Sequence, residues 1–304
     1  MMVLTGKFVN QIIKSDNIKA MSKMPDDFVN LTITSPHYRN AIDYDMHAKH
    51  GHSPEKNYRG KLEVDVKDYL KDMQRTFDEV RRITVEGGFC CIVIANEINR
   101  GTLMPLPAML TADLVDSGWN LHEEYVWHKV TGGANRAGSF IMNPYPTYFR
   151  ANIMHEKILV FRKGENKLRK EIGREFTNLN VQLYNEIANS IWHIAPVPPK
   201  HLEHPCPYPE EIPYRLISLY SYPNDIILDP FNGSGQTTKV AKHLGRKFIG
   251  IDNQKKYVEY AKKRLKESLK IRHESLVLEF DENQEIPRWK KLPTWTAAKI
   301  EDFK

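Results

Sequence analysis

Cysteines are scarce in this sequence of 304 residues, and long apolar runs are absent. Only three cysteines occur, and two of them, Cys90 and Cys91, are adjacent within an apolar segment. This scarcity argues against a disulfide framework and indicates a reducing compartment. A membrane span would need about 20 consecutive apolar residues, and Lys7, Asn10 and Lys14 interrupt the N-terminal segment. We therefore expect neither a membrane span nor a signal peptide, and a soluble, intracellular protein.

The sequence also has little net charge and no evident internal repeat. It contains 44 Lys and Arg against 38 Asp and Glu, which gives a formal charge of +6. Such a mild excess is compatible with a polyanionic partner without requiring one. With 41% apolar residues the chain can bury a core. Its length suits one large α/β domain with an insertion, or two modest domains.

Segments of strand-like and helix-like hydrophobic periodicity alternate along the chain, which favours the α/β class. Strands are predicted at residues 28–34, 89–95, 121–128, 153–161, 225–228 and 246–252. Helices are predicted at residues 66–83, 104–117, 213–220 and 237–244, and an opening strand and helix within residues 7–24. The aperiodic stretches 39–63 and 131–150 are expected to be irregular. The charged segment 163–170 is expected to be solvated.

The most informative motif is the sequence Asp-Pro-Phe-Asn-Gly-Ser-Gly-Gln-Thr-Thr at residues 229–238. It connects the strand at 225–228 to a helix, and the next strand ends at Asp252, about 20 residues after the glycines. This order predicts one β-α-β nucleotide-binding unit. Gly233 and Gly235 lack the Cβ that would block a ligand, and the carboxylate at the second strand's end can accept both ribose hydroxyls. A glycine loop alone is also compatible with an ordinary turn.

A second polar turn, Ser35-Pro36-His37-Tyr38, ends the strand at 28–34. Taken alone, such a turn only terminates a strand, because proline removes a backbone donor. Ligands of open α/β sheets bind at the carboxyl ends of strands, near a switch point of the topology. If this strand lies beside the strand before the glycine loop, the two turns share one cleft, and the serine turn is then predicted to be reactive.

The order of these motifs resembles the beta group of amino DNA methyltransferases, which use S-adenosylmethionine and place the catalytic motif before the cofactor motif. The resemblance spans about residues 7 to 266. Residues 34–38 look like the catalytic Ser-Pro-Pro-Tyr, residues 88–95 like the family's buried strand, residues 155–161 like its His-Glu strand, and residues 204–211 like its His-Pro-Ala-x-Phe-Pro segment.

Two residues depart from the family pattern. His37 stands where the family has its second proline, and Gln236 stands at the first threonine after Gly-Ser-Gly. Because the family uses the backbone carbonyl of its first proline, Pro36 keeps the required acceptor. His37 therefore bears on pocket shape and base choice, and Gln236 is expected to cap or line the start of the helix.

The resemblance implies an α/β fold with a Rossmann-like methyltransferase sheet, mostly parallel with an antiparallel edge strand, in permuted motif order. It also implies a division of the chain. Residues 1–130 form the catalytic half, residues 131–195 an irregular loop, the His-Glu strand and a short target-recognition region, residues 196–267 the cofactor-binding half of the same domain, and residues 268–304 a charged C-terminal tail.

The resemblance also assigns roles to individual residues. The implied catalytic residues are Ser35, Pro36, His37 and Tyr38. The implied S-adenosylmethionine-binding residues are Asp229, Pro230, Phe231, Gly233, Ser234, Gly235, Thr237, Asp252, Pro205 and Tyr208. We expect the irregular stretches to contact DNA through Arg39, Lys49, Lys56, Arg59, Arg136 and Arg150. No metal is expected, because the sulfonium leaves as a neutral thioether.

The implied reaction is methylation of an exocyclic amine in a flipped-out base. Hydrogen bonds from the amine to Ser35 Oγ and to the Pro36 carbonyl would aim its lone pair at the methyl group, while Tyr38 stacks on the base. Serine at position 35 favours cytosine N4, since the related adenine N6 enzymes mostly carry aspartate there. Adenine N6 in the same pocket, and an RNA amine, stay open as alternatives.

The implied partner is double-stranded DNA, with a cognate restriction endonuclease system as a further possibility. We expect a cytoplasmic protein, associated with the nucleoid in a prokaryote, without a membrane partner and either monomeric or homodimeric. A non-enzymatic nucleic-acid-binding module would not need Asp252 beside a glycine loop. An NAD-dependent oxidoreductase is disfavoured, because the turn lacks the Gly-x-Gly-x-x-Gly fingerprint.

Two further motifs resemble functional sites but are disfavoured. Pro205-Cys206 imitates the nucleophile of cytosine C5 methylation, yet it precedes the cofactor loop and no matching Glu-Asn-Val is present. His47, His50 and His52 have suggestive spacing, but no cysteine or acidic partner completes a metal set.

Overall fold

The structure, a computed structural model, divides into two units, residues 1–270 and residues 271–304, and the fold concerns the first. The residues that it describes are 6–37, 65–99, 102–130, 145–148, 151, 153–164, 175, 186–197, 202, 206–269 and 271. Most of the two stretches expected to be irregular therefore lies outside the described residues. None of the described helices is long and apolar enough to cross a membrane.

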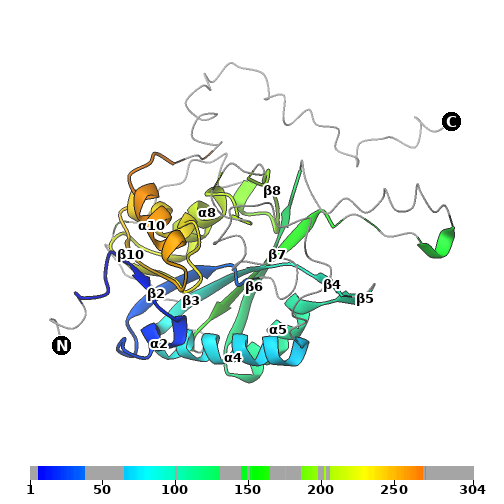
Figure 1. Cartoon of the computed structure of the whole chain (residues 1–304), viewed down its shortest axis with the longest axis horizontal. Coiled ribbons are helices and arrows are strands. Elements are labelled where there is room, and N and C mark those ends of the chain that lie inside the picture. The colour runs from blue at the N-terminus through cyan, green and yellow to red at the C-terminus, as the bar shows by residue number, and fades with distance from the viewer. Residues whose placement is uncertain are drawn as a thin grey trace, which may run out of the picture. The chain divides into compact units, whose positions relative to one another are not determined.

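An eight-stranded sheet forms the centre of the first unit (Figure 1). Its strands lie in the order β1 (Gln11–Lys14), β10 (Lys247–Asp252), β9 (Ile226–Asp229), β2 (Val29–Thr34), β3 (Thr84–Ile94), β7 (His155–Arg162), β6 (Asn120–His128) and β8 (Ile191–His193). All of these strands are parallel except β7, which is antiparallel to both of its neighbours. A separate hairpin pairs β4 (Glu97–Asn99) with β5 (Thr102–Met104).

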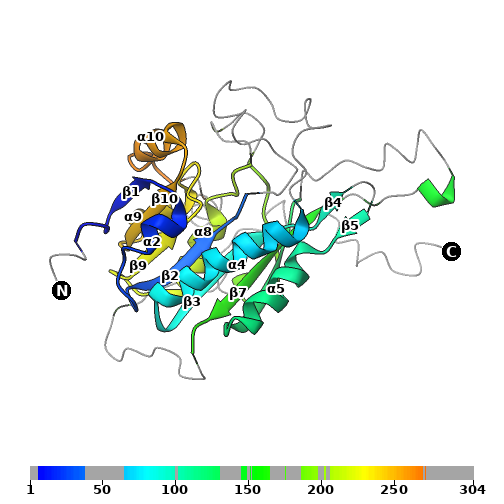
Figure 2. The same cartoon turned by 60° about the horizontal axis from the view of Figure 1, so that its bottom comes forward.

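Helices cover both faces of the sheet (Figure 2). One face packs against α2 (Asn17–Met21), α4 (Val66–Ile83) and α5 (Leu106–Asp116), and the other against α8 (Glu211–Tyr220), α9 (Gln236–His243) and α10 (Lys255–Arg264). A short 3₁₀ helix, η2, spans Pro146–Tyr148. This three-layer arrangement confirms the predicted α/β fold class.

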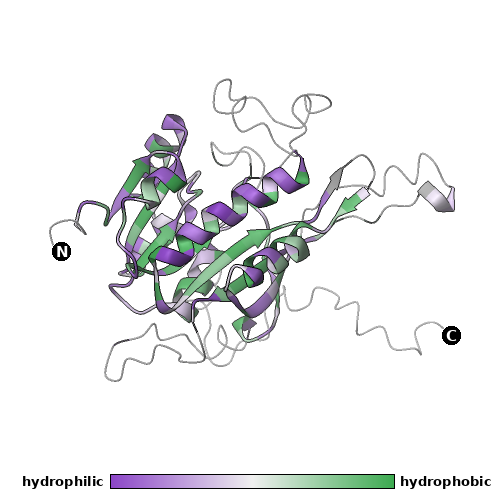
Figure 3. Cartoon of the chain, turned by 90° about the horizontal axis from the view of Figure 1, so that it is seen from below, coloured by the Kyte–Doolittle hydropathy of each residue, from purple (hydrophilic) through white to green (hydrophobic). Residues whose placement is uncertain are grey.

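The central strand β3 is apolar from Phe89 to Ile94 because both of its faces are covered (Figure 3). Along β3, Cys91 and Val93 belong to the core under α8 and α9, whereas Cys90 and Ile92 belong to the core under α4 and α5. Burial raises the pKa of both thiols. The prediction of a central, fully buried strand is confirmed, and the two cysteines pack as small apolar side chains.

Several elements differ from the sequence-based expectations. The antiparallel strand β7 is not itself the edge strand, since β6 and β8 lie beyond it. Strand β3 begins at Thr84, before the glycine pair that was expected to precede it, and its register against β2 shifts between Val29 and Leu31. A Cβ on Gly88 would lie 2.9 Å from the Asn30 carbonyl oxygen, so the strands approach closely there. The short strands β4, β5 and β8 and helix α10 were not predicted.

The segment 163–170 was expected to be solvated, but its first residue, Lys163, is largely buried. Its ammonium group donates to the Asp27 carboxylate at 2.8 Å and to the Thr84 carbonyl at 2.7 Å. The side chain is only 15% exposed. It therefore fastens the end of β7 to the start of β3.

The turn between β9 and α9 is locked against β10 by Asn232 and Gly250. Asn232 is buried, its Oδ1 accepts a hydrogen bond from Thr238 Oγ1 at 3.0 Å, and its backbone N–H donates to the Ile251 carbonyl at 2.9 Å. A Cβ on Gly250 would lie 2.6 Å from Asn232 Oδ1 and 2.7 Å from its Cγ. Glycine at position 250 is thus required by the asparagine packed on it.

We predict that Gly250→Ala lowers the free energy of unfolding by about 1–3 kcal/mol, because a short, buried side chain must move to admit the methyl group. Urea unfolding measures the effect. Asn232→Ala removes the two nearest atoms that the new Cβ meets and leaves Thr238 Cγ2 at 3.0 Å, so the double variant should be destabilised by less than the two single changes added together. Strict additivity, or a Gly250→Ala variant as stable as the unchanged protein, would contradict this packing.

Candidate active site

The serine turn, which follows β2, and the glycine turn, which follows β9, begin side by side. Strands β2 and β9 are hydrogen-bonded parallel neighbours, with Leu31 opposite Ile227 and Thr32 opposite Leu228. Both strands therefore end at the same edge of the sheet. The expectation that the serine turn and the glycine turn start from adjacent strands is confirmed.

A buried carboxylate connects these two strand ends. Asp229, the last residue of β9, is 1% exposed. Its Oδ1 accepts hydrogen bonds from Thr34 Oγ1 at 2.7 Å and from the Phe231 backbone N–H at 3.1 Å, and its Oδ2 lies 3.2 Å from the Tyr208 hydroxyl. Because Thr34 directly precedes Ser35, this carboxylate fixes the point where the serine turn leaves the sheet.

Two hydroxyl groups extend this connection to helix α9. The Tyr208 and Thr237 hydroxyls are 2.5 Å apart, and Thr237 Oγ1 donates to the Ile33 carbonyl at 3.2 Å. Tyr208 comes from the proline-rich segment, and Thr237 from the first turn of α9. The end of β2 is thus held at two consecutive residues, Ile33 and Thr34, by groups from the cofactor half of the chain.

Burial raises the pKa of Asp229 to about 6, and its hydrogen bonds, that from Thr34 foremost, offset only part of the effect. Burial dominates this balance, and the network has few hydroxyl protons with which to offset it. Thr237 gives its proton to Ile33, so the single proton of Tyr208 serves either Thr237 or the carboxylate. When Asp229 is protonated, each hydrogen bond along the path from Asp229 through Tyr208 and Thr237 to Ile33 has a proton of its own. When it is ionised, one contact lacks a proton.

Asp252 ends the neighbouring strand β10 and holds the glycine loop. Its Oδ2 accepts the Gly233 N–H at 2.9 Å, and its Oδ1 accepts the Gln254 N–H at 2.8 Å. Gly233 and Gly235 adopt positive φ angles of 46° and 80°, which side chains rarely tolerate. Burial raises the pKa of Asp252, and the two backbone donors oppose this shift. Each carboxylate oxygen keeps a lone pair for a further donor, such as a ribose hydroxyl.

Gln236, one of the two departures from the family pattern, lies buried between two elements. Its Nε2 donates to the Tyr208 carbonyl at 2.6 Å, and its Oε1 accepts a hydrogen bond from Arg264. Arg264 also donates to the Ser234 carbonyl at 2.7 Å, inside the glycine loop, and to Glu210 at 2.5 Å. The expectation that Gln236 lines the helix start stands, and Arg264 and Glu210 are site-supporting residues that the sequence reasoning missed.

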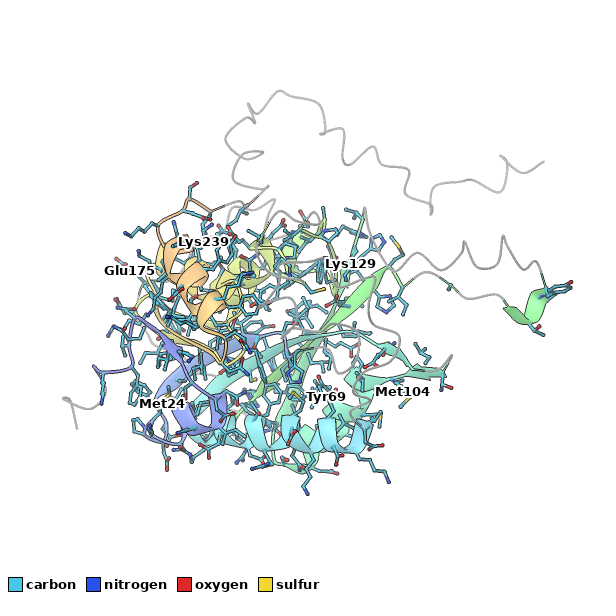
Figure 4. All side chains as sticks on the ribbon, viewed as in Figure 1. Met24, Tyr69, Met104, Lys129, Glu175 and Lys239 are labelled. Carbon is cyan, nitrogen blue, oxygen red and sulfur yellow. The ribbon has the colours of Figure 1, made fainter. Side chains whose placement is uncertain are left out.

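Lys239 completes this buried group. It lies on α9, across the sheet from Tyr69 of α4 (Figure 4), and donates to Glu210 at 2.7 Å. Its side chain is inaccessible to solvent. A lysine four residues into a helix carries no sequence signal of burial, whereas the acid pair Glu210-Glu211 before a proline was the available hint of a partner.

His37, the other departure, packs between the two halves of the site. Its ring lies edge-on to Tyr69, with centroids 5.7 Å apart, and 5.9 Å from the ring of Phe231 in the glycine loop. The Tyr69 hydroxyl donates to the His37 carbonyl at 3.2 Å. Burial lowers the pKa of the imidazole, and Asp72 opposes this shift. An aromatic ring thus takes the place of the family's second proline.

The structure brings together most of the residues expected to bind cofactor and to catalyse. Pro36, Pro230 and Ser234 are buried at the strand ends, and Ser35 is half-buried. Outside the described residues lie the expected catalytic, cofactor and DNA-binding residues Tyr38, Pro205, Arg39, Lys49, Lys56, Arg59, Arg136 and Arg150. Within the described part of the chain, no three His, Cys, Asp or Glu side chains are placed to hold a metal ion.

We predict that Asp229→Asn stabilises the protein at pH 8 by up to about 3 kcal/mol and has little effect near pH 4. The folded-state pKa, about 6, exceeds the ordinary value of 3.8, so the native state binds the proton more tightly and stability falls as pH rises through this range. An asparagine amide can donate to Tyr208 as the protonated acid does.

Urea unfolding at pH 4 and pH 8 measures this difference, and Asp225→Asn, a buried acid at the other end of β9, serves as the control. A stability gain that is equal at both pH values, or a loss confined to pH 8, would show that the fold does not disfavour the ionised form of Asp229.

Comparison with known proteins agrees with this geometry. The DNA methylase family model N6_N4_Mtase matches residues 29–263. The type II methyltransferase M.BglII of Bacillus subtilis is 28% identical over 297 residues, which cover 93% of this chain and 73% of that protein. M.MthZI of Methanothermobacter thermautotrophicus is 26% identical over 301 residues, which cover 90% and 81% respectively.

Solved structures share the fold. TTHA0409 of Thermus thermophilus, assigned provisionally as a DNA modification methylase, was solved with S-adenosyl-L-methionine. It has a TM-score of 0.66 and 25% identity, covering 84% of this chain and 93% of that one. At the level of the family, the prediction of S-adenosylmethionine as cofactor is confirmed. The family match and the two adjoining turns together show that this chain belongs to the N6_N4_Mtase family of DNA methylases, the DNA methyltransferases that modify exocyclic amines.

Proposed function

We propose that this protein transfers a methyl group from S-adenosylmethionine to the N4 amine of cytosine in double-stranded DNA. The observation that carries the proposal is the hydrogen bond from Thr34 to Asp229, which joins the serine turn to the glycine turn at adjacent strand ends. A base seated over the first turn and a sulfonium seated over the second would lie within reach of each other. Position and orientation are the main requirements of this reaction.

The amine must present its lone pair to the methyl group, although that lone pair is delocalised into the ring. Hydrogen bonds from the amine to Ser35 Oγ and to the Pro36 carbonyl favour a pyramidal nitrogen in line with the sulfonium. The base must leave the duplex to reach this turn, and Tyr38 follows as its stacking partner. S-adenosylmethionine, when bound, would supply the methyl group and leave as a neutral thioether, and the methylated amine would release one proton to solvent.

On the cofactor side, Asp252 accepts the ribose hydroxyls, and the loop from Phe231 to Gly235 borders the methionine part. Asp229 is enclosed, with its oxygens engaged by Thr34, Phe231 and Tyr208. We therefore assign Asp229 a positioning role within the cofactor motif, with no direct contact to the ligand. Pro205 and Tyr208 close the pocket in the same proposal.

Cytosine is preferred to adenine because position 35 is serine, which the related adenine enzymes mostly replace by aspartate. Either side chain can accept the amine hydrogen bond, so adenine N6 is the second candidate, and an RNA amine would use the same pocket. DNA contacts by the basic residues of 39–63 and 131–150, the division into two functional halves and a cognate endonuclease stay predictions.

We expect duplex DNA treated with the pure protein and S-adenosylmethionine to yield N4-methylcytosine on nucleoside mass spectrometry. Ser35→Ala should lower kcat at least about 100-fold, because removing one preorganised hydrogen-bonding group commonly costs that much, while S-adenosylmethionine affinity stays unchanged. Matched RNA serves as the comparison substrate. Detection of N6-methyladenine would overturn the base choice, and methylation confined to RNA would overturn the choice of substrate.

We further expect Asp252→Ala to weaken S-adenosylmethionine binding at least about tenfold in calorimetry, since it removes two charge-assisted hydrogen bonds and releases the Gly233 N–H. Asp116→Ala, an exposed acid at the end of α5, is the control and should bind normally. Unaltered binding by the first variant would remove Asp252 from the cofactor site.

A further inference from the structure

Three histidines lie in one row across adjacent strands at the far part of the sheet. His128 ends β6, and its register partners are His155, the first residue of β7, and His193, the last residue of β8. Register partners on neighbouring strands project from the same face of a sheet. His128, His155 and His193 therefore form what we call the histidine row.

The members of the row on β6 and β8 are in direct contact. The Nδ1 atoms of His128 and His193 are 2.9 Å apart, with ring centroids 5.1 Å apart and ring planes at 89°. Two nitrogens at this distance share a single proton. In the neutral pair, one ring then presents an Nε2–H and the other a bare Nε2. When the pair takes up one proton, both rings present an Nε2–H, and the pair carries one positive charge.

A protonated pair of this kind is suited to an anion with several acceptor oxygens, such as a phosphate. His155 adds a third imidazole on the same face. Burial lowers the pKa of His128, and the proximity of His193 and His155 lowers it further. A bound anion would favour the charged form of the His128 imidazole and so oppose this shift.

The other charged groups around the row are largely paired with each other. On the same face, Lys157 of β7 donates to Glu124 of β6 at 2.5 Å. On the opposite face, Lys129, which follows β6 (Figure 4), contacts Glu156. Strand β8 carries no titratable residue besides His193.

The row lies at the same edge of the sheet as the serine turn. Strand β7 is antiparallel to both β3 and β6, so β6 ends at the edge where β2 ends. Three strand spacings of about 4.8 Å separate β2 from β6. The registers set Thr34 level with Glu124, so His128 lies four residues farther along β6, and the row lies roughly 20 Å from the end of β2. Each strand of a duplex carries one phosphate per about 3.4 Å of helix axis. A duplex with its target base over the serine turn therefore places backbone phosphates at the distance of the row.

We propose that the histidine row binds a phosphate of the DNA backbone flanking the target base, and that the His128 and His193 pair takes up one proton as it does so. The proposal rests on DNA as the substrate, but not on which base is methylated. Phosphate contacts of this kind fix the register of the duplex on the protein without reading its sequence. They also make DNA affinity rise as pH falls, because binding and protonation favour each other.

The test uses the full chain and a fluorescein-labelled 20-base-pair duplex, with anisotropy measured at pH 8 and pH 6 at constant ionic strength, with and without EDTA. Uptake of one proton raises affinity by at most about tenfold per pH unit. We expect His193→Gln to bind within about twofold of the unchanged protein at pH 8, but about 3- to 10-fold more weakly at pH 6.

His122→Gln is the matched control, because His122 also lies on β6 but contacts the rings of Phe89 and Tyr220 instead of the row. It should keep the full pH dependence. Thermal unfolding verifies that each variant folds, and His128→Gln and His155→Gln ask the same question from the other two strands if His193→Gln does not fold. Equal pH dependence in the row variants and in the control would overturn the proposal.

Two further outcomes distinguish this proposal from a metal site and from the proposed function. Loss of the pH effect on adding EDTA would mean that a metal ion, and not a proton, fills the pair, and would also overturn it. Nucleoside mass spectrometry at pH 8 should show the same methylated base from His193→Gln and from the unchanged protein. A different or absent methylated base in both proteins would overturn the proposed function while leaving the phosphate site intact.

Discussion

A carboxylate enclosed at the end of β9 is the constraint on which the site depends. Burying Asp229 costs free energy, and its raised pKa of about 6 shows that hydrogen bonds from Thr34, Phe231 and Tyr208 do not fully offset that cost. A buried apolar residue would leave the donors of Thr34, Phe231 and Tyr208 without this acceptor, and it would not define the separation of the two strand ends. Burial of the carboxylate lowers the stability of the fold, but its hydrogen bonds fix the distance between the serine turn and the glycine turn. That distance is what a direct methyl transfer between two bound molecules requires.

The surrounding residues make this arrangement rigid from several directions. Tyr208 arrives from the proline-rich segment and Thr237 from α9, and both meet the end of β2. Asp252 holds the glycine loop from the next strand through Gly233. Because each contact comes from a different element, no single loop movement can separate the turns. The site is therefore preorganised by the sheet, and only residues after the strand ends are left to adapt to ligands.

Much of the fold was predictable because its signals are local. The helix at 66–83 shows regular apolar spacing, and the fully apolar run at the end of β3 reflects a strand covered on both faces. The adjacency of the two turns was a condition of the sequence argument, and the pairing of β2 with β9 meets it. Strand β8 was missed because three residues are too few to show a period. The roles of Lys163 and Arg264 were missed because their partners lie 79 and 30 residues away, where only tertiary packing brings them.

Gln236 and His37, the two departures from the family pattern, each make contacts that are specific to this chain. A threonine at position 236 would offer one short hydroxyl, whereas Gln236 reaches the Tyr208 carbonyl with its amide N–H and receives Arg264 on its amide oxygen. Arg264 in turn holds the Ser234 carbonyl, so the longer side chain extends the support of the glycine loop to α10. His37 likewise replaces a rigid ring by an aromatic one that contacts both Tyr69 and Phe231. Both changes therefore add contacts between elements at the site, which explains how the arrangement of the two turns is kept although the motif differs.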